Sequence, residues 1–196
     1  VFRKTGPPMT PAEATLLLND LTAIASRAAD AIRARPAATV AHTLKADQSP
    51  VSVADEAAEA VILDGLARLV PDIPAISEEA YQRAAPTSLQ PTFLLVDPLD
   101  GTREFLAGRD EFAVNIGLIH DGIPIAGVIA APARRLIWRG AAQRAERATD
   151  HGDGRVGDVT AIHARPWPAQ GAIATVSRSH LDPETTAYLA KLRSIV

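Results

Sequence analysis

The hydrophobic positions of this chain follow a helical period first and a strand period later. Apolar residues recur every three or four positions over residues 10–35, which predicts an amphipathic helix. The same spacing predicts a second helix over residues 52–69. Pro and Asp at residues 71–74 end the helical pattern before a short apolar strand at residues 75–76. Residues 81–91 favour a loop.

The middle of the chain reads as a series of β-strands separated by turn residues. We expect strands at residues 93–96, 112–119, 123–130, 136–140, 159–162 and 172–176. His120-Asp121-Gly122 is typical of a hairpin turn between two of them. Residues 142–155 are polar and glycine-rich and predict a loop, and a last helix is expected over residues 182–192. Helices followed by a meander indicate a layered α+β fold.

A chain of 196 residues can form one large domain or two small ones. We expect residues 1–9 to be an extension, because Met9 directly precedes a helix-start signal. An α+β domain with the functional site then spans residues 10–142, and residues 143–196 form an incomplete α/β domain.

Composition narrows the function classes. The net charge is −3 and the sequence has no Lys/Arg run, which argues against a nucleic-acid partner. The absence of cysteine excludes disulfides, thiolate metal sites and a cysteine nucleophile. The sequence contains neither a signal-peptide pattern nor an apolar stretch long enough for an integral membrane segment. We therefore expect a cytoplasmic protein, peripheral at the inner membrane at most.

The most informative segment is V-D-P-L-D-G-T-R-E-F at residues 96–105. Asp97 and Asp100 follow an apolar run, and Gly101 permits a sharp reversal directly after them. Two carboxylates about 4 Å apart repel by about 4 kcal/mol at an effective dielectric constant near 20. A bound divalent cation reverses that cost, and carboxylate oxygens are hard ligands that suit Mg²⁺. An Asp-rich surface turn is the simpler alternative.

Other oxygen ligands fall close to this turn in the expected fold. Glu78 follows the short strand at residues 75–76, so Glu78 and Asp97 emerge at one sheet edge if the two strands are neighbours. Asp100 would close over them, and Leu99 would offer its backbone carbonyl. Together these groups could hold one or two Mg²⁺ ions, with water completing the octahedral coordination.

The same turn offers groups for phosphate chemistry. Gly101 and Thr102 present backbone N–H groups at the start of a short helix, where a phosphate oxygen can bind. The Thr102 hydroxyl can hydrogen-bond a metal-bound water, and Asp55 can accept its proton. These parts predict metal-assisted hydrolysis of a phosphate ester.

Four segments together resemble a known family. They are residues 44–55 (L-K-A-D-Q-S-P-V-S-V-A-D), residues 73–79 (I-P-A-I-S-E-E), the acidic turn at residues 96–105, and residues 177–180 (S-R-S-H). They resemble the inositol monophosphatase superfamily of Mg²⁺-dependent, lithium-sensitive phosphatases, and within it the bacterial 3′(2′),5′-bisphosphate nucleotidase branch. The resemblance implies a layered αβαβα sandwich of the sugar-phosphatase type, truncated at its C-terminus, and possible homodimers. It also implies a place in sulfur metabolism.

The resemblance assigns a role to each residue of the motif. It implies that the metal ligands are Glu78, Asp97, the Leu99 carbonyl and Asp100. It implies that Asp55 and Thr102 orient the attacking water, and that substrate is contacted by Gly101, Thr102, Glu78 and Lys45. Glu79 is a weaker candidate for a supporting or third-metal position.

The implied reaction removes the 3′-phosphate of adenosine 3′,5′-bisphosphate, giving AMP and phosphate. An inositol or sugar monophosphate is the alternative substrate, because the metal site alone does not distinguish them. The sequence also departs from the family, which has a late Trp-Asp motif whose Asp binds the second metal. Trp138 and Trp167 are followed by Arg and Pro. The chain is therefore either a fragment or a truncated homologue with weak or no activity.

Overall fold

A computed structural model describes residues 10–37, 41–44, 50–83, 90–169, 171, 173–177 and 181–191. The extension predicted at residues 1–9 lies outside this range. The chain divides into two compact units, residues 1–162 and residues 163–196, and each is described by itself. The sequence placed this boundary after residue 142; it falls later because two further strands join the sheet of the first unit.

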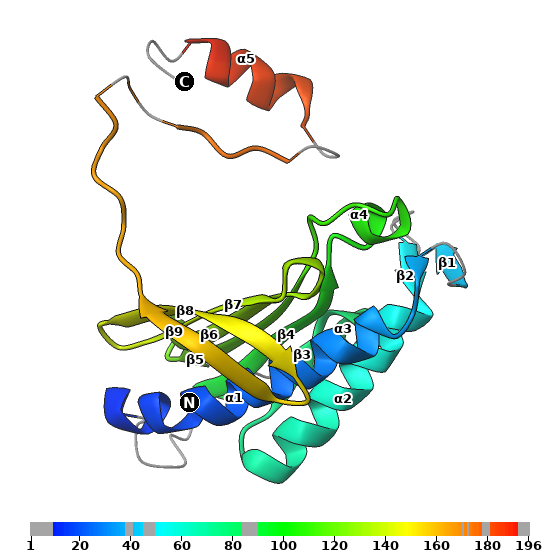
Figure 1. Cartoon of the computed structure of the whole chain (residues 1–196), viewed down its shortest axis with the longest axis vertical. Helices are drawn as coiled ribbons and strands as arrows, with labels where there is room; N and C mark the ends of the chain where they lie inside the picture. Colours follow the sequence, from blue (N-terminus) through cyan, green and yellow to red (C-terminus); the bar gives the residue numbers. More distant parts are fainter. Residues whose placement is uncertain are drawn as a thin grey trace. The chain divides into compact units, whose positions relative to one another are not determined.

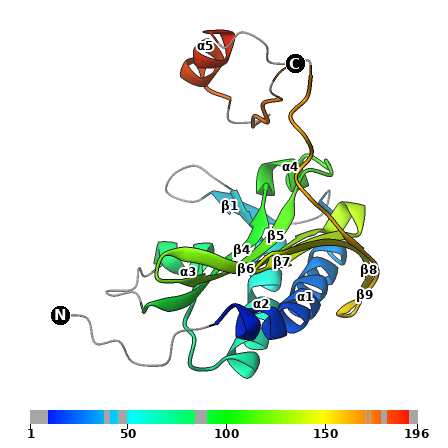
Figure 2. The same ribbon diagram turned by 90° about the vertical axis from the view of Figure 1, so that its left-hand side faces the viewer.

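A seven-stranded sheet forms the centre of the first unit (Figures 1 and 2). Its strands, in spatial order, are β3 (Ala75–Ser77), β4 (Thr92–Asp100), β5 (Ala113–His120), β6 (Ile123–Ala131), β7 (Leu136–Ala141), β8 (Arg144–Gly152) and β9 (Arg155–Ala161). The β3–β4 pair is parallel, and all other neighbours in this sheet are antiparallel. The strands predicted within residues 75–140 are confirmed, and the α+β class is confirmed with them.

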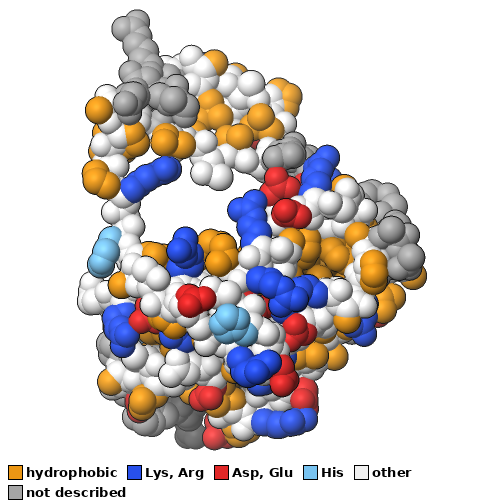
Figure 3. Space-filling view, viewed as in Figure 1, with side chains coloured by type: hydrophobic (Ala, Val, Ile, Leu, Met, Phe, Trp, Pro, Cys, Tyr) orange, Lys and Arg blue, Asp and Glu red, His pale blue; other side chains and the backbone are white. Residues whose placement is uncertain are grey.

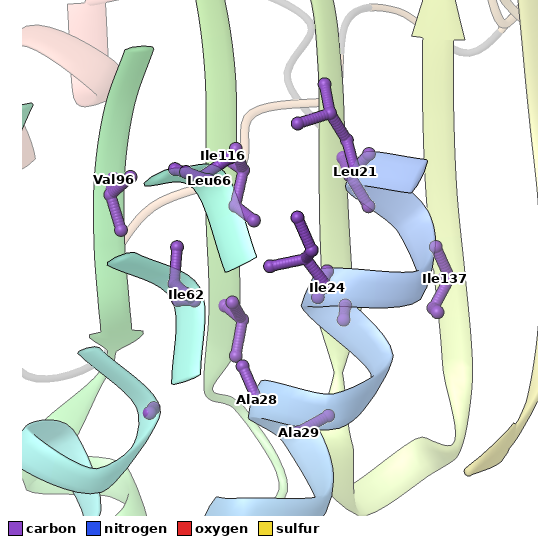
Figure 4. Close-up of a cluster of buried hydrophobic side chains, with 14 of the residues drawn as sticks. Leu21, Ile24, Ala28, Ala29, Ile62, Leu66, Val96, Ile116 and Ile137 are labelled. Carbon is purple, nitrogen blue, oxygen red and sulfur yellow. The ribbon is translucent and has the colours of Figure 1, made fainter. Parts of the chain in front are cut away.

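Two long helices, α1 (Pro11–Arg33) and α2 (Val53–Leu69), pack together on one face of this sheet (Figure 2). Both begin with a capping box, in which Thr10 bonds reciprocally with Glu13 and Ser52 with Asp55. Figure 4 shows how the core forms: apolar side chains of both helices meet those of the inward-facing strand positions. The labelled examples are Leu21, Ile24, Ala28, Ala29, Ile62, Leu66, Val96, Ile116 and Ile137.

Short elements complete the first unit. Strands β1 (His42–Leu44) and β2 (Pro50–Ser52) form an antiparallel hairpin that leads into α2. Helix α3 (Glu78–Arg83) follows β3, so the loop predicted over residues 81–91 is wrong for residues 81–83, and residues 84–89 of it lie outside the described residues. Helix α4 (Thr102–Leu106) follows β4, and the 3₁₀-helix η2 (Pro132–Arg134) links β6 to β7.

The loop predicted over residues 142–155 is wrong, because this segment forms β8 and the start of β9. Alternate residues of β8 are buried, as in an ordinary strand, but two of them are charged. Glu146 pairs with Arg139 at 2.9 Å, and Asp150 pairs with Arg33 of α1 at 2.8 Å. Polar residues at inward positions erase the hydrophobic alternation on which the prediction depended.

The second unit contains one helix among its described residues, α5 (Pro183–Lys191), close to the predicted range. Asp182 caps it, because its carboxylate accepts hydrogen bonds from the backbone N–H and the hydroxyl of Thr185. The strand predicted over residues 172–176 is wrong for its described part, since residues 173–176 belong to no strand of the described sheets.

Charged and apolar side chains are interspersed on the face of the first unit seen in Figure 3. Within the described part of the chain, no helix has both the length and the hydropathy that a membrane crossing requires.

Candidate active site

The site is built from the N-terminus of α2. Ser52 caps this helix, and Asp55 occupies the third helical position, as expected for a first-turn acid. The Oδ2 atom of Asp55 accepts hydrogen bonds from the Ser52 backbone N–H at 2.8 Å and from its hydroxyl at 2.6 Å. Asp55 is only 1% exposed. These bonds fix the carboxylate and leave its Oδ1 atom for a different partner.

That partner is Thr102, the first residue of α4. Its hydroxyl lies 2.9 Å from Asp55 Oδ1 and 3.0 Å from the Leu99 carbonyl oxygen, and one proton serves both acceptors. The preceding Gly101 has a φ of +89°, and a Cβ atom there would lie 2.7 Å from the Glu111 carbonyl oxygen. Only glycine fits this reversal, which sets Thr102 against Asp55.

Two acidic side chains follow the last residue pair of the parallel strands β3 and β4. In this register Ser77 pairs with Val96, so Glu78, the first residue of α3, and Asp97 of β4 come directly after neighbouring residues. The predicted meeting of Glu78 and Asp97 at one edge therefore follows from the strand order. Glu78 is exposed, whereas Asp97 is half-buried.

The charges of this edge act on Asp97. Burial, together with the negative charges of Glu78 and Asp100, raises the pKa of Asp97 to about 7, and Asp55 adds to the effect. The Leu99 backbone N–H donates to Asp97 Oδ1 at 3.2 Å and opposes the shift only in part. The negative charges of Glu78 and Asp100 thus make ionisation of Asp97 costly, as the sequence of the acidic turn predicted.

Asp100 is held from the next strand. The register between β4 and β5 is irregular between Asp97 and Asp100, which bends the strand end. The side-chain amide of Asn115 donates to Asp100 Oδ2 at 3.3 Å.

The remaining predicted residues have different outcomes. Leu99 is buried and its carbonyl already accepts from Thr102. Glu79 is 7% exposed, and Lys45 lies outside the described residues. Among the residues that the structure describes, no three acidic, histidine or cysteine side chains lie close enough together to hold one metal ion.

Sequence reasoning overlooked several supporting residues. Ser52 stands three positions before Asp55, which is the spacing of a capping box and could have identified it. Glu59 lies one helical turn after Asp55, is 7% exposed, and accepts a hydrogen bond from the Ser77 hydroxyl at 2.5 Å. Asn115 had no local signal, because only the β4–β5 register brings it to Asp100.

Comparison with known proteins identifies the family. The model of the inositol monophosphatase family matches residues 14–194. The chain belongs to the inositol monophosphatase family. Every described site residue named above lies within the matched range.

Individual relatives agree with this membership. The chain is 38% identical over 181 residues to the 3′(2′),5′-bisphosphate nucleotidase CysQ of Salmonella typhimurium, covering 90% of this chain and 69% of that protein. The crystal structure of CysQ from Bacteroides thetaiotaomicron, a bacterial member of the family, matches with a TM-score of 0.68 and 28% identity, over 91% of this chain and 70% of that one. An inositol monophosphatase from Zymomonas mobilis matches with a TM-score of 0.61 and 30% identity, over 86% of this chain and 61% of that one.

Proposed function

We propose that this protein is a Mg²⁺-dependent phosphomonoesterase that removes the 3′-phosphate of adenosine 3′,5′-bisphosphate, giving AMP and phosphate. The observation that carries the proposal is the Thr102–Asp55 hydrogen bond beside an acidic turn whose charges repel one another. The similarity to bisphosphate nucleotidases named CysQ supports the choice of substrate.

The donor set fits Mg²⁺ in its chemistry. Glu78, Asp97, Asp100 and the Leu99 carbonyl offer only oxygen atoms, which suit a hard cation better than zinc or copper. Glu78 and Asp100 are exposed, and we expect their side chains to rotate toward Asp97 when the cation binds. When bound, Mg²⁺ would acidify a coordinated water and neutralise charge on the phosphate.

Thr102 and Asp55 would orient the attacking water. Because the Thr102 hydroxyl donates its proton to Asp55, its oxygen lone pairs can accept a hydrogen bond from water. Burial raises the pKa of Asp55 even though hydrogen bonds from Ser52 and Thr102 lower it, which favours proton acceptance. The water oxygen would bond to phosphorus, the bond to the ribose 3′-oxygen would break, and the leaving oxygen would take up a proton.

The backbone N–H groups of Gly101 and Thr102 would contact the phosphate, as the sequence predicted. Lys45 and Glu78 remain proposed substrate contacts. A cytoplasmic location and a homodimer also remain predictions.

The test is phosphate release from adenosine 3′,5′-bisphosphate and from inositol 1-phosphate, with Mg²⁺ and with EDTA. We expect Mg²⁺-dependent release with preference for the nucleotide, and loss of release in Asp97→Asn while circular dichroism shows a folded protein. Retained activity in Asp97→Asn would refute the ligand assignment.

The inositol phosphatase alternative is favoured by one observation, the match to the Zymomonas mobilis enzyme. Equal or reversed substrate preference would establish it over the nucleotidase. A chain that binds Mg²⁺ without releasing phosphate from either compound would be the truncated, non-catalytic homologue.

A further inference from the structure

Glu59 is a buried carboxylate that has no role in the proposed reaction. It lies on α2, one turn after Asp55, and is 7% exposed. The Ser77 hydroxyl, itself fully buried, donates to Glu59 Oε1 at 2.5 Å. A carboxylate is costly to bury, so a retained one that accepts such a short hydrogen bond holds its partner firmly.

The position of Ser77 gives this bond its significance. Ser77 is the last residue of β3, and the next residue is Glu78, a proposed metal ligand. Helix α2 therefore carries two carboxylates on one face, four residues apart. Asp55 holds Thr102 after β4, and Glu59 holds Ser77 at the end of β3.

We propose that Glu59 is a positioning residue for the acidic site. By accepting the Ser77 hydroxyl, it fixes the backbone that presents Glu78 at a set distance from Asp55 and Thr102. This inference rests on the proposed function, since it assigns Glu78 a bound cation. Because Asp55 and Glu59 lie one helical turn apart on α2, helix α2 sets the distance between Glu78, the proposed metal ligand, and the Asp55–Thr102 pair.

Geometry, rather than the charge of Glu59, is the essential property in this proposal. The side-chain carbonyl of glutamine can accept the Ser77 hydroxyl in the same way, whereas alanine cannot. Supporting hydrogen bonds to metal ligands are worth about 10–100-fold in metal affinity in other proteins. Removing either member of the pair should therefore weaken cation binding on that scale.

The experiment measures Mn²⁺ binding to the full chain by the loss of the free Mn²⁺ EPR signal, alongside thermal unfolding. The variants are Ser77→Ala, Glu59→Ala and Glu59→Gln. Ser26→Ala is the matched control, because Ser26 is also fully buried and its hydroxyl donates to a carboxylate, Asp150, at 2.6 Å. Asp97→Asn shows whether the Mn²⁺ measured is bound at the acidic turn.

We expect Ser77→Ala and Glu59→Ala to raise the Mn²⁺ Kd about 10–100-fold. Glu59→Gln should stay within about threefold of the wild type, since it restores the acceptor. Ser26→Ala should lower Tm about as much as Ser77→Ala does, with no change in Kd.

The outcomes separate the two proposals. If the wild type binds no Mn²⁺, or Asp97→Asn binds it equally, the proposed metal site fails and this inference fails with it. If the wild type binds at the acidic turn but Ser77→Ala and Ser26→Ala have the same Kd, only the positioning role is overturned. If Glu59→Gln is as weak as Glu59→Ala, the geometric account is wrong. Should Glu59→Ala not fold, Ser77→Ala and Glu59→Gln decide the question.

Discussion

Replacing Gly101 by alanine tests whether backbone geometry places Thr102 against Asp55. Gly101 adopts a φ of +89°, which L-residues rarely adopt. The new methyl group would also lie 2.7 Å from the Glu111 carbonyl oxygen and 3.2 Å from the Phe112 Cα atom. Both neighbours are backbone atoms, so neither can rotate away.

Two penalties therefore add at this position. A left-handed backbone costs an alanine about 1–2 kcal/mol. Overpacking against fixed atoms costs about 1–3 kcal/mol more. Gly108, at the other end of α4, is a matched control, because its φ is +68° but a Cβ atom there meets nothing within 4 Å. Gly108→Ala should pay only the first penalty.

Thermal unfolding and phosphate release together check this prediction. For a chain of this size, about 1 kcal/mol lowers Tm by about 2–4 °C. Gly108→Ala should lose a few degrees and keep its activity. Gly101→Ala should lose about twice as much or more, and its phosphate release should fall by at least about tenfold as Thr102 moves from Asp55. Equal losses of Tm in the two variants would refute the steric reasoning.

Three further predictions concern charge and capping. Without metal, Asp97→Asn should raise Tm at pH 8, because it removes a half-buried carboxylate whose pKa is raised to about 7. The gain in the free energy of unfolding is at most about 4 kcal/mol, and solvent screening reduces it. As pH falls from 8 to 5, the metal-free wild type should gain stability as Asp97 binds its proton, whereas Asp97→Asn should not; a parallel gain in both proteins, measured by Tm, would contradict this. Ser52→Ala should destabilise α2 by about 0.5–2 kcal/mol in urea unfolding and lower kcat, because it removes the hydroxyl that donates to Asp55 Oδ2 and leaves only the backbone N–H there; an unchanged kcat would show that this N–H and Thr102 suffice to fix Asp55.

Local sequence signals predicted much of this structure. The helices α1 and α2 carry both an apolar stripe and a cap, and β4 to β7 are short apolar segments bounded by turn residues, so local sequence was sufficient to predict them. The positions of Asp55 and Thr102 at helix starts were local signals too, whereas their hydrogen bond depends on the fold. By contrast, two inward positions of β8 are the charged residues Glu146 and Asp150, so the strand lacks an apolar alternation. They form ion pairs with arginines on β7 and α1. Asn115 and Ser77 likewise reach the site only through strand register.

Glu146 of β8 and Asp97 of the acidic turn are both at least half-buried, and the charges that act on them differ. Burial would raise the pKa of Glu146, but hydrogen bonds and charges from Arg139 and Arg144 lower it below its usual value. Its stabilising effect is present above the unfolded pKa and is lost as pH falls through the lower folded pKa. The pKa of Asp97 shifts in the opposite direction, because burial raises it and the charged neighbours Glu78 and Asp100 raise it further. The fold places arginines beside Glu146 of β8, whereas the carboxylates beside Asp97 increase the cost of its charge. A charge that the protein itself leaves costly is one that an external cation can stabilise, and this contrast is why we assign the metal to the β3–β4 edge rather than to β8.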